Sequence, residues 1–331
     1  MTLKLGLTVR PFRFGLQAAR VTDPAAWTEL ARLAQSSGYS SLMIPDHLPR
    51  LATFPSLMAA AAVTTSLKLT TYVLNQDFRP PGILAQEAAS AQLFTEGRLE
   101  LGIGAGWAER EYRQAGLRYD PAAVRVARFD EYLQVVRGLL HAVTAFSFSG
   151  LFYTLREFQP LPRASAGAPP ILVGGGSERV LTTAGRYAEI VSIATRATPD
   201  SRIDSRNITL AAVDRKVGWV RSAAGQRFAD IELNMTIRDV AVTDDRRAAA
   251  SQLLAHWQGG HTSMANAESL TEDDVLDSPH IAVGTVNQIV EQFETQRDRW
   301  GINYFEISSN DMQALAPVVE RLATTPSPAR G

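Results

Sequence analysis

The sequence predicts an α/β protein with the (β/α)8 TIM-barrel fold and insertions. Short apolar strand patterns alternate with amphipathic helix patterns along the chain, and eight strand segments can be counted. No marked linker separates one half of the chain from the other. Such a barrel needs about 250 residues, so 331 residues leave room for insertions. We therefore expect a single barrel domain over residues 1–331.

The first half of the chain gives four strands. Leu and other residues alternate over 3–9, which predicts the first strand. Asp23 and Pro24 then predict a helix start, because Asp caps free backbone N–H groups and Pro tolerates the first helical position. The elements expected next, in order, are a strand at 40–44, a helix at 56–64, a strand at 67–74, a helix at 83–94, a strand at 98–103 and a helix at 125–141.

The second half gives four more strands, expected at 170–173, 190–194, 231–240 and 304–308. Ser177 is expected to cap the helix after the first of them. Thr285 and Gln288 fit a capping box, in which each side chain satisfies a free backbone donor of the other. The remaining helices are expected at 211–223, 245–258, 285–300 and 311–323.

Two insertions and a tail complete the chain. The segment 142–168 is rich in aromatic residues and predicts a hairpin near Phe146, whereas 259–283 is polar and acidic and is expected to be loop-like. Long loops of this kind are often lids or interaction segments. Residues 325–331 are expected to be frayed.

Composition excludes several classes of function. The 33 Lys and Arg residues nearly balance 34 Asp and Glu residues, so no general nucleic-acid-binding role is expected. Without Cys, the chain has no disulfides, thiolate metal sites or Cys nucleophiles. The five His residues show no metal-ligand spacing, and no metal is predicted. Apolar runs are too short to cross a bilayer and no signal-peptide pattern is seen, so a cytoplasmic protein without membrane contact is expected.

Candidate site residues follow the strands, because the loops after barrel strands converge at one end. His47 can move protons near neutral pH, and Asp46 can orient it. Alternatively, Asp46 caps a turn and His47 fills a loop. Asn75 offers a donor and acceptors to a heterocyclic ring, although Asn after a strand is often only a turn residue.

Glycines alternate at the end of the fourth predicted strand. Gly102, Gly104 and Gly106 would let a flat ring approach the backbone, or would relieve crowding inside the barrel. Trp107 is either a substrate wall or a loop aromatic that packs on another ring. Glu109 and Glu111 are minor catalytic candidates, since carboxylates are common at helix starts.

A second glycine run, Gly174-Gly175-Gly176-Ser177, precedes a helix and predicts a phosphate site, because free N–H groups and the helix dipole attract anions. A structural turn is the alternative. A Rossmann sheet is disfavoured, since Trp107 interrupts the Gly-x-Gly-x-x-Gly pattern on the fourth strand. A phosphate cradle, a Gly-lined ring site and one His together suit an organic redox cofactor.

These residues also resemble the bacterial-luciferase-like superfamily of flavin and deazaflavin oxidoreductases. The resemblance runs from Leu3 to about Leu322 and looks closest to the branch that uses coenzyme F420. Its motifs occur in one order and are Ile44-Pro-Asp-His47, the run from Val73 to Pro81, the run from Gly97 to Trp107 with Glu111, Tyr112 and Gly116, the run from Ile171 to Ser177, the run from Ala184 to Tyr187, and Val283-Gly-Thr285.

The resemblance implies a site at the carboxyl ends of the barrel strands and a homodimer. It implies a cis peptide at Tyr72-Val73 beneath the cofactor ring. Catalytic residues would be Asp46 and His47 beside the redox carbon, and Thr195 would join Trp107 on the substrate side. Cofactor contacts would come from Tyr72, Val73, Asn75, Gly104, Ala105, Gly106, Gly174, Gly175, Gly176 and Ser177.

The expected function is hydride transfer between coenzyme F420 and a small organic substrate, with His47 handling the proton. Sugar-phosphate dehydrogenases of the family have Glu where this chain has Trp107, which argues for a less polar substrate. One alternative is an FMN-dependent monooxygenase that uses O2 and is served by a flavin reductase. A non-catalytic flavin-binding protein is the other.

Overall fold

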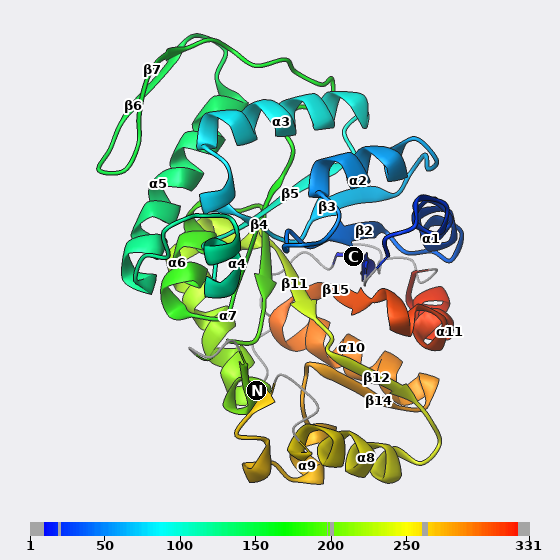
Figure 1. Cartoon of the computed structure of the whole chain (residues 1–331). Helices are drawn as coiled ribbons and strands as arrows, with labels where there is room; N and C mark the ends of the chain where they lie inside the picture. Colours follow the sequence, from blue (N-terminus) through cyan, green and yellow to red (C-terminus); the bar gives the residue numbers. More distant parts are fainter. Residues whose placement is uncertain (1–9, 19–20, 197, 199–201, 260–263, 324–331) are drawn as a thin grey trace.

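The computed structural model describes residues 10–18, 21–196, 198, 202–259 and 264–323. Within them, eight parallel strands form a closed barrel surrounded by helices (Figure 1). Pairing of β3 with β5 and of β15 with β1 closes the ring. The barrel order is β1 (Arg13–Gln17), β2 (Ser41–Ile44), β3 (Lys68–Thr71), β5 (Leu99–Gly104), β8 (Ile171–Gly175), β9 (Ile190–Ile193), β11 (Glu232–Thr236) and β15 (Ile302–Ser308). The predicted TIM-barrel fold is confirmed.

The helices lie close to their predicted positions. Asp23 accepts a hydrogen bond from the Ala26 N–H at 2.7 Å, and the capping box of Thr285 and Gln288 is formed. The helices are α1 (Pro24–Ser36), α2 (Thr53–Ala61), α3 (Pro81–Phe94), α4 (Glu109–Gln114), α5 (Ala122–His141), α6 (Glu178–Tyr187), α7 (Leu210–Ala224), α8 (Arg246–Gln258), α9 (Glu272–Leu276), α10 (Val286–Trp300) and α11 (Met312–Ala323).

Three predictions in the first half need correction or fall outside the structure. The predicted strand at 3–9 lies outside the described residues, and Arg13–Gln17 occupies the first place in the barrel. Helix α2 begins three residues before the predicted start at Ser56. The third strand is interrupted after Thr71 by a cis peptide, and β4 (Leu74–Asn75) continues beside β5.

The seventh predicted strand is two strands. β11 ends at Thr236, and β12 (Asp239–Val242) leaves the barrel to pair in parallel with β14 (Ile281–Gly284). The segment 259–283 was wrongly predicted as loop, because its described part holds β13 (Met264–Ala265), α9 and β14. Its apolar residues pack with α8 around a second hydrophobic cluster that includes Trp257 and Val275. Scattered apolar residues among many acids concealed this small core.

The other predicted insertion is confirmed as a hairpin. β6 (Phe146–Ser149) and β7 (Thr154–Phe158) pair in antiparallel and project beyond α3 and α5 (Figure 1). Phe146 packs over Gly138 of α5, which anchors the base of the hairpin. The predicted fraying of 325–331 lies outside the described residues.

Candidate functional site

His47 lies in the loop after β2, and its side-chain partner is Glu111. The His47 Nδ1 atom lies 2.8 Å from Glu111 Oε1, and the ring of Trp107 meets the His47 ring edge-on at 5.8 Å. Glu111 comes from α4, which begins just after the β5 loop. The barrel therefore brings together residues 64 positions apart, and Nε2 of His47 has no hydrogen-bond partner within the described part of the chain.

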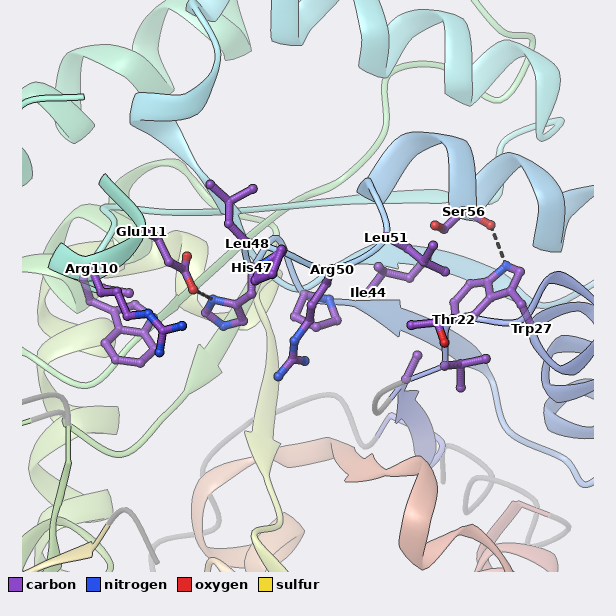
Figure 2. Close-up of a pocket in the computed structure, with 16 residues that line it drawn as sticks. Thr22, Trp27, Ile44, His47, Leu48, Arg50, Leu51, Ser56, Arg110 and Glu111 are labelled. Carbon is purple, nitrogen blue, oxygen red and sulfur yellow. Dashed lines mark hydrogen bonds and ion pairs between the residues drawn. The ribbon is translucent and has the colours of Figure 1, made fainter. Parts of the chain in front are cut away.

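A cleft of about 550 Å³ adjoins this pair (Figure 2). His47 and Glu111 lie toward one end, and the cleft continues toward Trp27 of α1. Trp107 lines the cleft beside the His47 ring. Trp107 is 48% exposed, so it forms an open wall and does not pack on Tyr112. Arg50 and Arg110 add two guanidinium groups. The other lining side chains are mostly apolar: Ala18, Val21, Ile44, Pro45, Leu48, Pro49, Leu51 and Ala108.

Asp46 does not orient His47, contrary to that part of the prediction. Its carboxylate pairs with Arg79 at 2.9 Å and accepts hydrogen bonds from the Asn75 N–H and the Thr53 hydroxyl, both at 3.2 Å. These contacts hold the loop after β2 against the segment that follows the cis peptide. Asp46 therefore supports the shape of the barrel mouth, the end of the barrel at which the strands have their carboxyl ends. Asp46 precedes His47 in the sequence, but the side-chain partner of His47 is Glu111.

Asn75 has the contacts of a turn residue, one of the two interpretations that the sequence left open. Its Oδ1 atom accepts from the Asp77 N–H at 3.1 Å and lies 3.1 Å from the Tyr112 hydroxyl, whose shorter hydrogen bond goes to Asp77 Oδ2 at 2.7 Å. A Cβ atom on Gly106 would lie 1.9 Å from the Tyr112 hydroxyl, and Gly106 has φ +72°. Tyr112 thus requires glycine at 106. Burial raises the pKa of the Tyr112 phenol above its usual value, so Tyr112 acts as a fixed hydrogen-bond donor.

The Tyr72-Val73 peptide is cis, as the resemblance implied. Val73 projects toward the glycines of two strands. A Cβ atom on Gly104 would lie 2.8 Å from Val73, and one on Gly174 would lie 3.4 Å from it. At Gly102 an added Cβ would lie 1.8 Å from the Thr71 carbonyl oxygen. Crowding inside the barrel therefore explains Gly102, and Gly104 and Gly174 make room for Val73. Ala105 follows at the half-buried start of the loop.

Tyr72 enters a polar cluster near the carboxyl ends of the strands. Its hydroxyl lies 2.6 Å from Ser192 Oγ, 2.9 Å from Asn234 Oδ1 and 3.1 Å from Thr236 Oγ1. Burial raises the pKa of the Tyr72 phenol well above its usual value. We name this group the upper polar cluster, with Glu306 as its fifth member: Tyr72, Ser192, Asn234, Thr236 and Glu306.

The predicted phosphate cradle lies at the end of β8 and the start of α6. Ser177 is the N-cap residue, but its side chain makes no capping hydrogen bond, so first-turn N–H groups of α6 have no side-chain cap. A Cβ atom on Gly176 would lie 2.7 Å from the Arg196 N atom, so the loop after β9 closes over this glycine. Thr195 lies beside Gly176 and does not line the His47 cleft. The geometry fits a phosphate group.

Sequence reasoning did not single out Glu306, Asn234 and Thr236, and it ranked Glu111 as minor. Glu306 and Asn234 lie inside otherwise apolar strand patterns. A polar residue at an inward position of such a strand was the signal that could have identified them. No group of three or more His, Asp or Glu side chains suits a metal ion among the residues that the structure describes. Within the same residues, no helix combines the length and apolar character that spanning a bilayer requires.

The fold and the site define a barrel oxidoreductase class, and comparison with known proteins names the family. A family model described as luciferase-like monooxygenase matches residues 4–304. The chain belongs to this family. Its relatives and structural neighbours include F420-dependent oxidoreductases and flavin-dependent monooxygenases.

Individual relatives fit this assignment. An uncharacterized protein of Mycobacterium tuberculosis is 32% identical over 193 residues, which cover 51% of this chain and 65% of that protein. An F420-dependent glucose-6-phosphate dehydrogenase of Nakamurella multipartita is 29% identical over 73% of this chain and 71% of its own length. A solved F420-dependent secondary alcohol dehydrogenase, in complex with an F420-acetone adduct, shares the fold with a TM-score of 0.71 at 18% identity, covering 96% of this chain and 100% of that one.

Proposed function

We propose that this protein transfers a hydride between coenzyme F420 and a small organic substrate. The observation that supports the proposal best is the His47–Glu111 pair, which lines the cleft, while the uncapped α6 N-terminus follows another strand of the same barrel. The residues present fit a phosphorylated ring cofactor. Gly175, Gly176 and Ser177 would hold its phosphate, and the loop around Val73, Asn75 and Gly104 would support the ring.

The chain's own residues would handle binding and the proton. Bound F420 supplies a ring carbon that accepts or gives up a hydride. Glu111 holds His47 through Nδ1, which leaves Nε2 to accept or return the substrate proton. Trp107 limits water at the cleft and fixes the plane of the His47 ring through their edge-on contact.

The cleft supports a particular kind of substrate. Its walls are mainly apolar, and Arg50 and Arg110 form no salt bridge among the residues that the structure describes. An organic molecule with an apolar body and one acidic group would satisfy both features. Trp107 stands where sugar-phosphate dehydrogenases of the family have Glu, and this supports a substrate that is not a sugar phosphate.

An FMN-dependent monooxygenase remains the second candidate, since FMN presents a similar ring and phosphate and the family model is described as monooxygenase. Titration of the purified protein with F420 and with FMN separates the two. We expect micromolar binding of F420. Binding of FMN with none of F420 would favour the monooxygenase, and binding without turnover on a broad substrate panel would favour a flavin-binding protein.

Two variants of Ser177 locate the phosphate. Ser177→Asp keeps a favourable N-cap residue for α6, so the helix should stay folded, but its charge opposes a phosphate. We expect at least about tenfold weaker cofactor binding in Ser177→Asp. Ser177→Asn is the matched neutral control and should change affinity by less than about threefold. Equal affinities for the two variants would move the phosphate site elsewhere.

A further inference from the structure

Glu306 is a buried carboxyl group on β15, and it faces the barrel interior. Tyr304, two residues earlier on the same strand, contacts the interior residues Ser41 and Glu100, so Glu306 shares that face. Thr236 stands opposite Glu306 on β11, and Gly15 stands opposite it on β1. Glu306 is 2% exposed. It therefore lies within the barrel, beneath the mouth, and the Met43 side chain fills the space over Gly15 on the β1 side.

Thr236 stands between Glu306 and the mouth. It faces Glu306 across the paired strands β11 and β15, its hydroxyl acts against the raised pKa of the Glu306 carboxyl, and Thr236 Oγ1 lies 3.1 Å from the Tyr72 hydroxyl. Tyr72 in turn reaches Asn234 Oδ1 at 2.9 Å. Two buried polar atoms of this assembly, Glu306 Oε2 and Asn234 Nδ2, have no hydrogen-bond partner within the described residues. A buried polar atom without a protein partner is open to a hydrogen bond from water, a ligand group or a gained proton.

The charges around Glu306 leave its protonation state free to change near neutral pH. Burial raises the pKa of the Glu306 carboxyl to about 7. Arg238, after β11, opposes this rise, and Asp311, after β15, adds to it. Tyr72 is the third ionisable group that faces it, and the Glu306 charge contributes to the raised pKa of the Tyr72 phenol.

We propose that Glu306 is a positioning residue whose gain or loss of a proton reverses the hydrogen bonds through Thr236 and so sets the direction of the Tyr72 hydroxyl at the mouth. A protonated Glu306 donates to Thr236, which donates to Tyr72, which donates to Asn234. An ionised Glu306 only accepts, so Thr236 donates to Glu306 and its oxygen accepts from Tyr72. Glu306, Thr236 and Tyr72 thus give the mouth two arrangements of hydrogen-bond donors and acceptors, one for each protonation state of Glu306.

The inference rests on the proposed function in one respect only. If a ring cofactor occupies the mouth above Tyr72, ionised Glu306 places a negative charge beneath an anionic ligand. Cofactor binding should then weaken as pH rises through neutrality. The reversal of the hydrogen bonds itself requires no cofactor and can be tested without one.

Infrared difference spectra of the protein alone, recorded between pH 6 and pH 8, test the reversal. We expect loss of a protonated-carboxyl carbonyl band together with a change in a tyrosine C–O band. Glu306→Gln should abolish both changes, and Tyr72→Phe and Thr236→Val should each abolish the tyrosine change while keeping the carboxyl band. Glu291→Gln, which neutralises an exposed acid on α10, should leave both changes intact. A tyrosine change that persists in Thr236→Val would overturn the proposal.

Binding of FMN at pH 6 and pH 8 supplies the second measurement. The FMN phosphate itself titrates near pH 6, so the informative quantity is the ratio of wild-type to Glu306→Gln dissociation constants at each pH. We expect this ratio to rise about fivefold or more from pH 6 to pH 8. A constant ratio with bound FMN would overturn the link to the cofactor. Failure of both FMN and F420 to bind would count against the proposed function, whereas the infrared result would still decide the role of Glu306.

Discussion

The barrel interior holds two polar clusters that differ in how their charges are balanced. Near the amino ends of the strands, Arg13 pairs with Glu100 and Glu232, and its guanidinium lies 4.1 Å from the centre of the Tyr304 ring. Tyr304 and Thr70 hydrogen-bond to Glu100, and Ser41 to Tyr304. We name this group the lower polar cluster: Arg13, Ser41, Thr70, Glu100, Glu232 and Tyr304.

The upper polar cluster is built differently. Glu306 has no ion pair at bonding distance among the described residues, and two buried atoms there lack partners. A cluster whose charges are all paired gains nothing from changing protonation or from binding a ligand, so the lower one fits a structural role. A cluster with unsatisfied groups beside the mouth is instead available to respond to ligand or pH. In this barrel, the unpaired polar atoms of Glu306 and Asn234 lie in the cluster beside the mouth.

The largest effect is expected when the lower polar cluster is disrupted. Arg13→Met removes the cation and leaves Glu100 and Glu232 as buried, unpaired carboxylates. We expect the free energy of unfolding to fall by about 3–5 kcal/mol, measured by urea denaturation at pH 7. Cofactor affinity of the folded protein should stay within about twofold, because the mouth is unaltered. A fall of less than about 1 kcal/mol in the free energy of unfolding would show that the lower polar cluster contributes little to the stability of the barrel.

The second largest effect is expected on turnover, when His47 at the barrel mouth is replaced. His47→Ala should lower turnover by about 100-fold or more, the usual contribution of general acid–base catalysis, with cofactor affinity little changed. Steady-state rates on a substrate found by panel screening, together with cofactor titration, measure the two quantities. Thermal stability should remain near wild type, since His47 is partly exposed. Retained turnover would remove His47 from the mechanism.

A third prediction uses the pH dependence of stability to separate the clusters. The pKa of Glu306 is about 7 in the folded state, above its ordinary value of 4.5, so the folded state holds this proton more tightly. The resulting stability is fully present below pH 4.5 and is lost as pH rises through about 7. Between pH 5 and pH 8, urea denaturation should show a decline of about 1–3 kcal/mol that Glu306→Gln removes. Equal declines in both proteins would contradict it.

The smallest effect refines the His47 site. Glu111→Gln removes the charge from the His47 contact but keeps a hydrogen-bonding side chain of the same size. Since a hydrogen bond to a charged group contributes about 1.5–3 kcal/mol, we expect turnover to fall about tenfold. Glu109→Gln is the matched control, two positions away and exposed, and should change turnover by less than twofold. Equal rates for the two variants would show that Glu111 does not assist His47.

Local patterns were enough to predict much of the fold. Alternating strand and helix signals gave the barrel, and the caps at Asp23 and Thr285 were correct because they depend on residues three positions apart. The same reasoning failed at the seventh strand and at 259–283. There the strand β12 and the small core around Trp257 depend on packing against β14 and α8, which short windows of sequence do not show.

The candidate site shows a similar division. The resemblance indicated the cis bond at Tyr72-Val73, which the structure confirms, and the strand pattern placed His47 and the run Gly174–Ser177 after barrel strands. Phosphate binding at that run stays a prediction. The partner of His47 could not be predicted, because Asp46 is adjacent in sequence while Glu111 is 64 positions away, and strand pairing decides which carboxylate meets the ring.

The sequence by itself determined the barrel class and the strand ends from which a site must be built, because hydrophobic period, caps and glycine runs are local properties. The family followed from the resemblance of its ordered motifs. Only the tertiary structure decided which acids act together. It paired Glu111 with His47, assigned Asp46 to Arg79, and buried Glu306 beside Thr236 without a balancing charge. The physical reason is that charge pairing and desolvation depend on distances between strands, and those distances are fixed only when the barrel closes.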